Sequence, residues 1–488
     1  MIVTGDEMRA MEEAAFASGA TANDLMEQAG AQIAQAVRQF YPAPATVLVF
    51  YGKGHNGGDA LVAARRLAEV GWRIVLRAQE NDPAKLSELT RIKLDALGPQ
   101  KKQTQRPRVI LDGLLGIGAR GPLRDDIRVL TREINRYRCK HGAHTFAIDL
   151  PTGLDSETGE ADADCVLADF TLTIGFAKHG LVADRAANFV GRLAVLPLEQ
   201  LVGKTKTDDE VATPANLAPL LPRRKFESHK TNYGRIGIVA GSVGFTGAAL
   251  LAAEGALRAG AGLVTLYALP EIQPILASTA PKEVMVKPIA SYLEVPDSKR
   301  DVLAIGPGLG SERSDEILQL IERSDCPMIV DADALNALAK TKNIPLLTRC
   351  AGPRLLTPHP GEMARLFETE NRSRSEIVHV FTERFSVTLL LKGSRTVIGE
   401  KGKPLSYNTT GSPGMATGGM GDVLTGVCAA LTGQKLALFD AARLGAWLCG
   451  RAAELAIFHG PESEESLAAT DITRHLGTAF KQLQAGCF

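Results

Sequence analysis

The residues with the clearest chemical potential lie near the C-terminus, in a glycine-rich segment that ends in a carboxylate. Residues 408–422 read Asn-Thr-Thr-Gly-Ser-Pro-Gly-Met-Ala-Thr-Gly-Gly-Met-Gly-Asp, and the run from Val423 to Leu431 predicts a helix. Glycines before a helix start leave backbone N–H groups unblocked, where the helix dipole also favours an anion. A carboxylate such as Asp422 is poorly placed at the mouth of a site for a bound anion, unless it has a function such as taking a proton from a hydroxyl group that faces a phosphate. The segment indicates phosphoryl transfer to an alcohol, and the alternative is an ordinary aspartate cap.

Three further segments of the C-terminal half carry polar groups at predicted strand ends. Lys392-Gly-Ser-Arg-Thr396 follows an apolar strand, and a lysine leaving a strand beside glycine suits a nucleotide phosphate. His359 stands between two prolines, which hold it rigidly whether or not it has a role. Asp331 and Asp333 follow another strand, where metal binding and helix capping are both open.

The N-terminal half has a glycine-rich turn of a different kind. Gly52, Gly54 and Gly57 satisfy the dinucleotide pattern G-x-G-x-x-G, with Glu80 as a candidate for the ribose contact. Asp59, however, would stand in the first helical turn, where a pyrophosphate site disfavours added negative charge. The Asn-Gly-Gly-Asp turn instead suits a ligand with both phosphate and hydroxyl groups, or a cation.

Two more loops of this half pair a strand-end carboxylate with glycine or proline. One begins at Asp112 and runs through Arg120 to Pro122, and the other begins at Asp149. Because loops at the carboxyl ends of the strands share one crevice in an open α/β sheet, we expect Asn56, Asp59, Asp112 and Asp149 to converge. Each aspartate taken singly is equally well explained as a turn or cap residue.

Two series of short apolar runs, many followed by glycine, predict two wound α/β sheets that position these loops. The first series is Thr46–Phe50, Trp72–Leu76, Arg108–Leu111, Thr145–Ile148 and Phe170–Ile174; the second is Arg235–Val239, Leu263–Tyr267, Val302–Ile305, Pro327–Val330, Arg354–Leu356 and Val387–Leu391. Polar and proline-bearing residues from 204 to 224 separate them. We expect two domains, residues 1–206 and 207–488.

Composition limits the class of protein. At 488 residues the chain is too long for one typical core, which agrees with two domains. Lys plus Arg and Asp plus Glu each total 55, so charge supports neither nucleic-acid nor membrane-surface binding. Seven scattered cysteines and no apolar run of signal-peptide or membrane-spanning length predict a soluble cytoplasmic protein with reduced thiols.

The N-terminal half resembles the NAD(P)H-hydrate epimerase domain in the segments Leu25–Gly30, Gly52–Asp59, Asp112–Gly118 and Ile148–Asp155. The resemblance implies a Rossmann-like αβα sandwich over about the first 205 residues, with Asp149 assisting in acid/base chemistry. It also implies a K⁺ ion on Asn56, Asp112 and Thr152. The hydrated nucleotide would be held by His55, Asn56, Gly57, Gly58, Asp59, Gly116, Ile117, Gly118, Ala119, Arg120, Gly121, Pro122 and Asp149. His55 departs from the asparagine common in the family.

The C-terminal half looks like the ADP/ATP-dependent NAD(P)H-hydrate dehydratase family, above all in Pro413–Asp422, and also in His229–Gly234 and Gly244–Ala249. That resemblance implies a ribokinase-like α/β fold, with Asp422 as general base. By motif, the hydrated nucleotide would contact Ala248, Gly308, His359 and Asp422, and ADP would contact Lys392, Gly393, Ser394, Arg395, Thr396 and Gly421.

Together the two resemblances imply repair of hydrated NADH and NADPH: epimerisation of the R and S forms, then dehydration of the S form with ADP or ATP and Mg²⁺. We lean toward ADP, and we expect a homo-oligomer. One alternative is a ribokinase-type small-molecule kinase with a nucleotide-binding accessory domain, which predicts a stable phosphorylated product. A second makes the N-terminal half a non-catalytic nucleotide-binding or protein-interaction module. An NAD-dependent oxidoreductase is least favoured, because no residue pair beyond the weak glycine pattern indicates hydride transfer.

Overall fold

The computed structural model describes residues 1–100, 106–118, 121–203, 205, 207–221, 223–295 and 300–488. The chain forms two compact units, Met1–Thr213 with Phe488, and Pro214–Cys487. This division by contacts falls a few residues after the predicted boundary at 206, and the exact domain limits stay a prediction.

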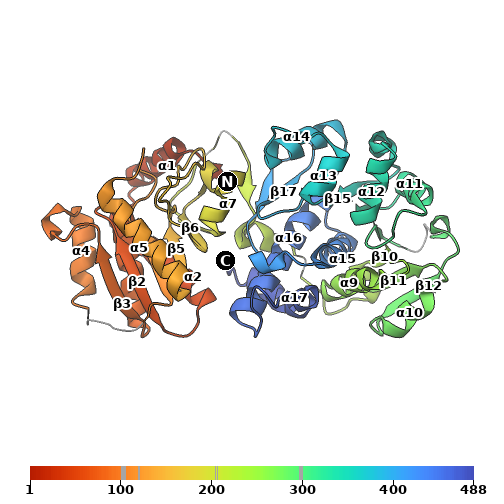
Figure 1. The fold of residues 1–488 in the computed structure, drawn as a ribbon, viewed down its shortest axis with the longest axis horizontal. Helices are drawn as coiled ribbons and strands as arrows, with labels where there is room; N and C mark the ends of the chain where they lie inside the picture. Colours follow the sequence, from red (N-terminus) through yellow and green to blue (C-terminus); the bar gives the residue numbers. More distant parts are fainter. Residues whose placement is uncertain (101–105, 119–120, 204, 206, 222, 296–299) are drawn as a thin grey trace. The chain divides into compact units, whose positions relative to one another are not determined.

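The first unit is built on a parallel sheet with the strand order β3-β2-β4-β5-β6-β8 (Figure 1). Its strands are β2 (Thr46–Tyr51), β3 (Arg73–Ala78), β4 (Val109–Gly113), β5 (His144–Ile148), β6 (Phe170–Ile174) and β8 (Arg192–Leu196). The first five confirm the predicted strands to within two residues, whereas β8 was not predicted. The strand order reverses between β2 and β4, which is where open α/β sheets bind ligands.

Helices cover both faces of this sheet. Phe40 at the end of α2 packs on Phe146 and Phe170, which neighbour each other on β5 and β6. Ile134 of α5 packs with Leu48 and Ile110, which point to the other face because successive strand residues alternate. The predicted αβα sandwich is therefore confirmed. The elements are α1 (Gly5–Ala17), α2 (Ala22–Phe40), α3 (His55–Glu69), α4 (Glu88–Leu97), α5 (Asp125–His141), α6 (His179–Val182), α7 (Ala187–Val190), β1 (Ile2–Val3), β7 (Ala177–Lys178) and β9 (Glu210–Val211).

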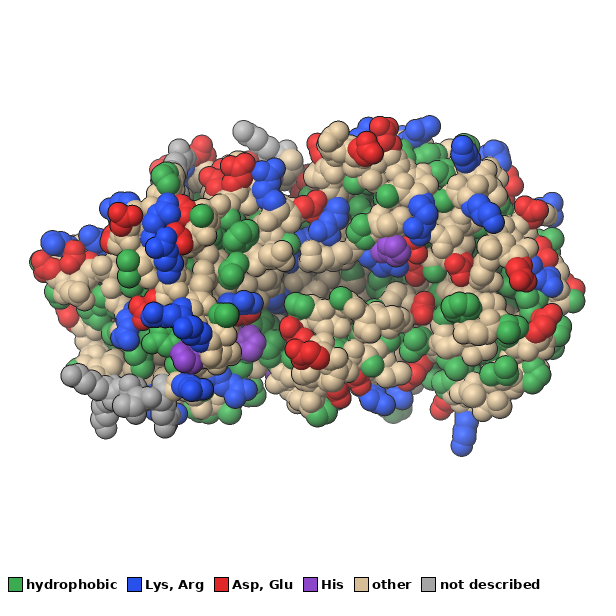
Figure 2. Space-filling view, in the orientation of Figure 1, with side chains coloured by type: hydrophobic (Ala, Val, Ile, Leu, Met, Phe, Trp, Pro, Cys, Tyr) green, Lys and Arg blue, Asp and Glu red, His purple; other side chains and the backbone are tan. Residues whose placement is uncertain are grey.

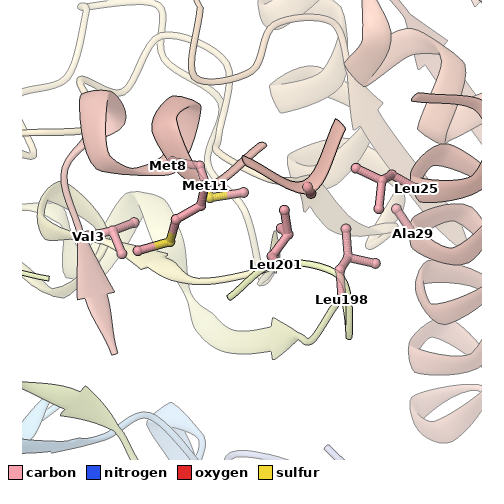
Figure 3. Close-up of a cluster of buried hydrophobic side chains, with 8 residues drawn as sticks. Val3, Met8, Met11, Leu25, Ala29, Leu198 and Leu201 are labelled. Atoms are coloured by element: carbon pink, nitrogen blue, oxygen red, sulfur yellow. The ribbon is translucent and has the colours of Figure 1, made fainter. Parts of the chain in front are cut away.

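Helix α1 is anchored by a separate apolar cluster (Figure 3). Met8 and Met11 on one side of α1 pack with Leu198 and Leu201, and Val3 belongs to the same cluster. The start of the helix is fixed by a capping box, in which Thr4 and Glu7 bond each other's backbone N–H groups. The cluster therefore fixes the position of α1.

The second unit contains a longer mixed sheet, in which the strands follow the order β12-β11-β10-β13-β14-β15-β16-β17-β18. They are β10 (Arg235–Val239), β11 (Leu263–Ala268), β12 (Val284–Pro288), β13 (Val302–Ile305), β14 (Met328–Val330), β15 (Arg354–Leu356), β16 (Thr388–Leu391), β17 (Thr396–Gly399) and β18 (Ser406–Asn408). Pairing is parallel from β12 to β16 and antiparallel at β16–β17 and β17–β18. All six predicted strands are confirmed; β12, β17 and β18 were not predicted.

Helix α15, which starts beside the glycine-rich segment, packs against α9 and reaches β13 and β14. A Cβ atom built at Gly426 would lie 1.9 Å from Ala252 O, so only glycine permits this approach of the two helices. The helices of this unit are α8 (Pro214–Leu217), α9 (Thr246–Arg258), α10 (Gln273–Thr279), α11 (Ser314–Arg323), α12 (Ala332–Lys340), α13 (Pro360–Leu366), α14 (Arg374–Arg384), α15 (Met420–Gly433), α16 (Leu438–Phe458) and α17 (Ala469–Gln484). The α/β architecture predicted for this half is confirmed.

The surface and the cysteines agree with the composition. Acidic and basic side chains are interspersed on the face shown in Figure 2. All seven cysteines are free. Among the helices of the described residues, none has the length and apolar character needed to cross a membrane.

Candidate active sites

In the first unit, the loops after β2 and β4 lie directly against each other. A Cβ atom built at Gly52 would lie 2.0 Å from Leu114 O, and one at Gly57 would lie 2.1 Å from Gly52 O. These two glycines are therefore required by close backbone approach. The Asn56 side chain donates from Nδ2 to Leu115 O at 2.9 Å, which ties the start of α3 to the loop after β4.

Asp112 and Thr152 form the buried end of this arrangement. Thr152 donates to the Asp112 carboxylate from its backbone N at 2.8 Å and from Oγ1 at 2.7 Å. Leu115 N donates to Thr152 Oγ1 at 3.2 Å, so the chain of contacts leads back to the loop that Asn56 holds. Burial raises the pKa of Asp112 to about 6, although hydrogen bonds from Thr152 oppose the shift. An anionic oxygen, a hydroxyl and an amide thus lie together, which is a donor set that a hard cation accepts.

Asp149 lies next to this group. It has a φ of +64°, which is rare for a residue with a side chain and is concentrated at functional sites. Its Oδ1 lies 2.5 Å from Nζ of Lys178. A Cβ atom built at Gly116 would lie 3.4 Å from Asn56 Cβ and 3.6 Å from Asp149 Oδ2. Of the four residues predicted to converge, Asn56 and Asp149 meet at Gly116, and Asp112 is linked to Asn56 through Thr152 and Leu115.

Two further carboxyl groups act on Asp149. Burial, followed by the charges of Asp149 and Glu12, raises the pKa of Asp59 well above its usual value. The pKa of Glu12 on α1 is also raised, by burial first and the Asp149 charge second. Asp59 was predicted for this site, but Glu12 and Lys178 were not. Lys178 lies at the end of β7 and not directly next to a glycine, so the signal that singled out Lys392 was absent.

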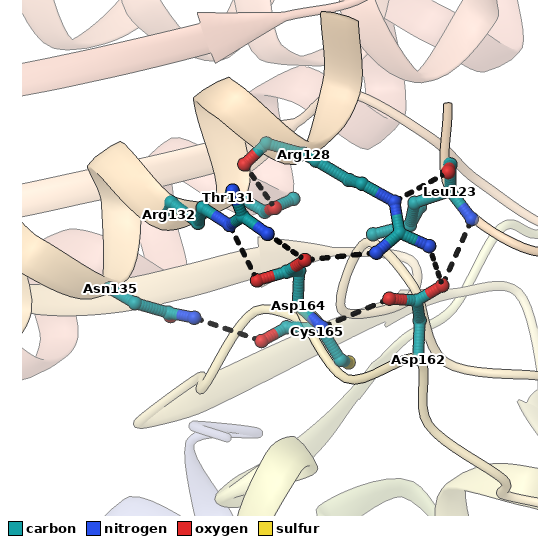
Figure 4. A network of polar contacts seen from close by, with 8 residues as sticks. All are labelled: Leu123, Arg128, Thr131, Arg132, Asn135, Asp162, Asp164 and Cys165. Atoms are coloured by element: carbon teal, nitrogen blue, oxygen red, sulfur yellow. Dashed lines mark hydrogen bonds and ion pairs between the residues drawn. The ribbon is translucent and has the colours of Figure 1, made fainter. Parts of the chain in front are cut away.

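Leu123, the residue after Pro122, is held by an ion-pair network (Figure 4). Asp162 accepts from Leu123 N and from Arg128 Nη2, each at 3.0 Å, while Arg128 Nε donates to Leu123 O at 2.8 Å. The backbone N of Asp162 bonds Gly153 O, so the same residue also anchors the loop that carries Thr152. The predicted residues Ala119 and Arg120 lie outside the described residues.

Glu80 does not behave as a free ribose-binding acid. Its carboxylate accepts from Asp82 N at 3.1 Å and pairs with Lys53 at 3.4 Å and Lys85 at 3.3 Å. These contacts, the Asp82 hydrogen bond first, lower the pKa of Glu80 to about 2. The geometry gives no support to the plain dinucleotide pattern.

In the second unit, Asp422 lies in the first turn of α15. The helix begins at Met420, three residues earlier than predicted, because Gly419 takes a left-handed φ of +86° at the cap position. Burial raises the pKa of Asp422 to about 6, helped by the charge of Asp331 and opposed by that of Lys392. A partly buried carboxyl with this pKa is ionised at neutral pH and basic enough to take a proton.

Lys392 joins three loops around Asp422. Its Nζ lies 2.9 Å from Asp331 Oδ1 and 4.0 Å from Glu362 Oε2, and its backbone N donates to Pro358 O at 2.9 Å. Burial acts to lower the pKa of Lys392, but the charges of Asp331 and Glu362 outweigh it and raise the pKa. A Cβ atom built at Gly421 would lie 3.2 Å from Lys392 Nζ, so the predicted nucleotide residues Gly421 and Lys392 lie side by side.

The two aspartates left open by the sequence have separate contacts. Asp331 Oδ2 accepts from Thr425 Oγ1 of α15 at 2.8 Å. Asp333 Oδ2 accepts from Gly310 N at 2.8 Å, so it holds the loop after β13. Neither contact is a side-chain cap of α12, which starts at Ala332. Among the described residues, no group of three or more His, Cys, Asp or Glu side chains is arranged to hold a metal ion by itself.

His359 caps helix α13. Its Nδ1 accepts from Gly361 N at 3.0 Å and Glu362 N at 3.3 Å, and Glu362 Oε2 accepts from His359 N at 2.8 Å. This reciprocal pattern is a capping box in which a ring nitrogen replaces a hydroxyl. The predicted rigidity of His359 is confirmed, and its contact with substrate stays a prediction.

The remaining predicted residues form two groups. Gly308 has a φ of +64°, and a Cβ atom there would lie 3.0 Å from Ala248 Cβ, so these two substrate candidates are adjacent. In the loop after β16, Thr396 Oγ1 donates to Gly393 O at 3.1 Å. Arg374 of α14 donates to Arg395 O at 3.2 Å and to Ser394 Oγ at 3.3 Å. The structure therefore gathers Ala248 with Gly308, and Lys392 with Gly421.

Comparison with known proteins identifies both halves. A family model described as NAD(P)H-hydrate dehydratase matches residues 236–475, and one described as YjeF-related protein N-terminus matches residues 22–180. The bifunctional NAD(P)H-hydrate repair enzyme Nnr of Moorella thermoacetica is 36% identical over 502 residues, which cover 94% of this chain and 92% of the relative. The chain belongs to the bifunctional NAD(P)H-hydrate repair enzyme family.

Other members of the repair enzyme family match over a similar extent. The Escherichia coli enzyme is 36% identical over 471 residues, which cover 92% of this chain and 88% of the relative. A solved structure titled ADP/ATP-dependent NAD(P)H-hydrate dehydratase from Bacillus subtilis, co-crystallised with ATP/Mg²⁺, is 29% identical, with a TM-score of 0.49, and covers 57% of this chain and 99% of its own. The two resemblances drawn from the motifs are confirmed at the level of the repair enzyme family.

Proposed function

We propose that this protein repairs hydrated NADH and NADPH through two activities, one in each unit. The first unit interconverts the R and S hydrates, and the second dehydrates the S form with ADP as phosphoryl donor. The observation that carries the proposal is the position of Asp422, partly buried in the first turn of α15 among Lys392, Asp331 and Gly421. Family membership over both halves of the chain supports the pairing of the two activities.

In the second unit, Asp422 takes the proton of the ring hydroxyl while that oxygen attacks the terminal phosphorus of ADP and the bond to AMP breaks. The ring nitrogen then expels the phosphate ester as inorganic phosphate. Loss of a proton from the neighbouring carbon restores the double bond. The pKa of about 6 supports Asp422 as the base, because the group is ionised at neutral pH.

The charge of the transferred phosphoryl group needs positive partners. Lys392 and the backbone N–H groups before α15 supply these from the chain itself. Mg²⁺ would add charge neutralisation, held by the carboxylates near Asp422 together with the phosphates, because magnesium in such sites takes only one or two protein carboxylates. The cluster fits such an ion, since the like charges of Asp331, Asp333 and Glu362 all act to raise the pKa of Asp422.

In the first unit, we assign acid/base work to Asp149. Protonation of the ring hydroxyl lets the ring nitrogen expel it as water, and water adding to the opposite face returns a proton to the base and gives the other epimer. Asp149 Oδ2 points toward the loop of Gly116, which supports its contact with substrate. A K⁺ ion on Asn56, Asp112 and Thr152 would hold the neighbouring phosphate, and the buried carboxylate of Asp112 fits a cation.

The competing proposal is a ribokinase-type kinase that stops at the phosphorylated alcohol. The two differ in products: the repair enzyme releases inorganic phosphate and restores NADH absorbance, whereas the kinase accumulates an ester. Incubating the protein with a mixed hydrate preparation, Mg²⁺, K⁺ and either ADP or ATP, with chromatography of both epimers, tests the proposal. Loss of both epimers with equal NADH and phosphate supports repair, and a stable ester contradicts it. Preference for ADP, homo-oligomerisation and a cytoplasmic location stay predictions.

A further inference from the structure

A buried lysine contacts the candidate epimerase base. Lys178, at the end of β7, is 1% exposed, and its Nζ lies 2.5 Å from Asp149 Oδ1. The same nitrogen lies 3.1 Å from Thr173 Oγ1 and 3.0 Å from Ile174 O. Three contacts use the full donor capacity of an ammonium group, so Lys178 can act only through Asp149.

The two carboxylate oxygens of Asp149 have different surroundings. Besides Lys178, Oδ1 accepts from Ile174 N at 3.3 Å and lies 3.4 Å from Thr173 Oγ1. Oδ2 instead lies toward Gly116, 3.6 Å from where a Cβ atom on that residue would stand. One oxygen is therefore fixed to the protein and the other faces the loop proposed to hold the hydrated nucleotide.

Two carboxyl groups also interact with the Asp149 charge. Glu12 does so from α1, where Arg9 acts on it as well, and Asp59 does so from α3, after the first helical turn in which it was predicted. The apolar cluster of Figure 3 fixes α1. Both carboxyl groups disfavour a second negative charge beside them, since each has a pKa raised in part by Asp149. Lys178 is the cation that contacts Asp149 and offsets them.

We propose that Lys178 is a positioning residue for the epimerase reaction: it holds Asp149 Oδ1 and so turns Oδ2 toward the substrate. The inference rests on the proposed epimerase function and goes beyond it, because it assigns a role to a residue that does not touch substrate. A purely structural ion pair is the alternative. The left-handed backbone of Asp149, at φ +64°, favours a functional role, because such strain persists where the surroundings hold a group for a task.

The test measures kcat and KM for exchange of the two hydrate epimers at pH 7, with correction for uncatalysed exchange. ADP is left out so that dehydration does not occur. Lys178→Met is compared with Lys178→Arg, which keeps the charge, and with Lys93→Met. Lys93 is a matched control: it is 5% exposed and pairs with Glu27 at 2.8 Å, away from Asp149. Far-UV circular dichroism and thermal unfolding report whether each variant folds.

For Lys178→Met we expect kcat at pH 7 to fall about 100-fold with KM changed less than about threefold. Lys178→Arg should retain most of the wild-type kcat, and Lys93→Met should match the wild type in both kcat and KM. If Lys178→Met does not fold, Thr173→Val removes a neighbour of both groups and should lower kcat by a smaller amount.

The outcomes separate this inference from the proposed function. No epimer exchange by the wild type would overturn the epimerase function itself. Exchange by the wild type, with an unchanged kcat in a folded Lys178→Met or Thr173→Val variant, would overturn the role of Lys178 alone. An equal loss of kcat in Lys93→Met would make the effect one of general stability and would also contradict the inference.

Discussion

The ammonium nitrogen of Lys392 lies 2.9 Å from Oδ1 of Asp331, and the other oxygen of that carboxylate accepts from Thr425 of α15. One buried aspartate therefore links the loop after β16 to the helix that carries Asp422. Asp331 is 1% exposed, so removing its cationic partner would leave a buried charge unpaired and destabilise the fold. The same contact fixes the position of the Lys392 ammonium group beside Gly421, where we place the nucleotide phosphates.

Replacing Lys392 by Met should weaken nucleotide binding. We expect KM for ADP in the dehydratase reaction to rise about 10- to 100-fold, because a charged hydrogen-bond partner of a phosphate contributes about 1.5–3 kcal/mol. The unfolding temperature should also fall, because Asp331 loses its cationic partner. Lys401→Met is the control, since Lys401 is exposed and pairs with Glu383 at 3.8 Å. Equal KM values for the Lys392 variant and the wild type would contradict the assignment.

The pH dependence of dehydration should report Asp422. Because burial raises the pKa of this carboxyl to about 6, the fraction in the basic form, and with it kcat/KM, should fall as the pH drops through 6. The same raised pKa affects stability. Protonated Asp422 favours the folded state at low pH, and this stabilisation is lost as the pH rises through 6. Asp333→Asn removes a like charge that raises the pKa, and the acid limb should move to lower pH. A limb near 4 in the wild type would be the contrary result.

The sequence predicted many strand ends well because buried parallel strands are apolar runs, and several are followed directly by glycine, as Thr46–Tyr51 and Val302–Ile305 are. It missed β12 because this edge strand is half-exposed. It missed β17, a strand of four residues whose first residue, Thr396, also ends the segment Lys392–Thr396 assigned to the nucleotide phosphate. Short antiparallel additions at a sheet end depend on tertiary contacts more than on local pattern.

Site residues at strand ends were predictable for the same reason. Three of them, Asp112, Asp149 and Lys392, lie where a strand ends and a loop begins. The structure places Asp112 beside Thr152, Asp149 near Asn56, and Lys392 beside Gly421. Glu12 was not predictable, because α1 reaches Asp149 only through packing between segments distant in sequence. The helix cap made by the His359 ring could not be predicted either, because ring nitrogens are not usual helix caps.

Potassium should stabilise the first unit through Asp112. At a K⁺ concentration about tenfold above Kd, we expect the unfolding temperature to rise by about 3 °C or more relative to choline chloride. Asp112→Asn should abolish this rise, because it removes the anionic ligand. Asp169→Asn serves as the control, since Asp169 pairs with Arg138 at 2.7 Å instead of facing the site. A rise that survives in Asp112→Asn would exclude the proposed ligand set.

The network in Figure 4 should matter for substrate binding in the first unit. Arg128→Met releases Asp162 and, with it, Leu123 at the end of the Gly116–Pro122 loop. We expect KM for epimer exchange to rise about tenfold with a smaller change in kcat, because the loop positions substrate without touching the reacting carbon. Arg138→Met, which breaks an ion pair on the same helix, should leave KM unchanged. Equal effects of the two variants would point to stability alone.

The most direct test of the account uses the purified S hydrate, ADP and Mg²⁺, with NADH absorbance and inorganic phosphate followed together for the wild type and Asp422→Asn. The account predicts one NADH per phosphate in the wild type and a loss of at least about 1,000-fold in turnover for the variant, with ADP binding retained. Turnover by Asp422→Asn near the wild-type rate, or a phosphorylated nucleotide that accumulates without NADH, would contradict it.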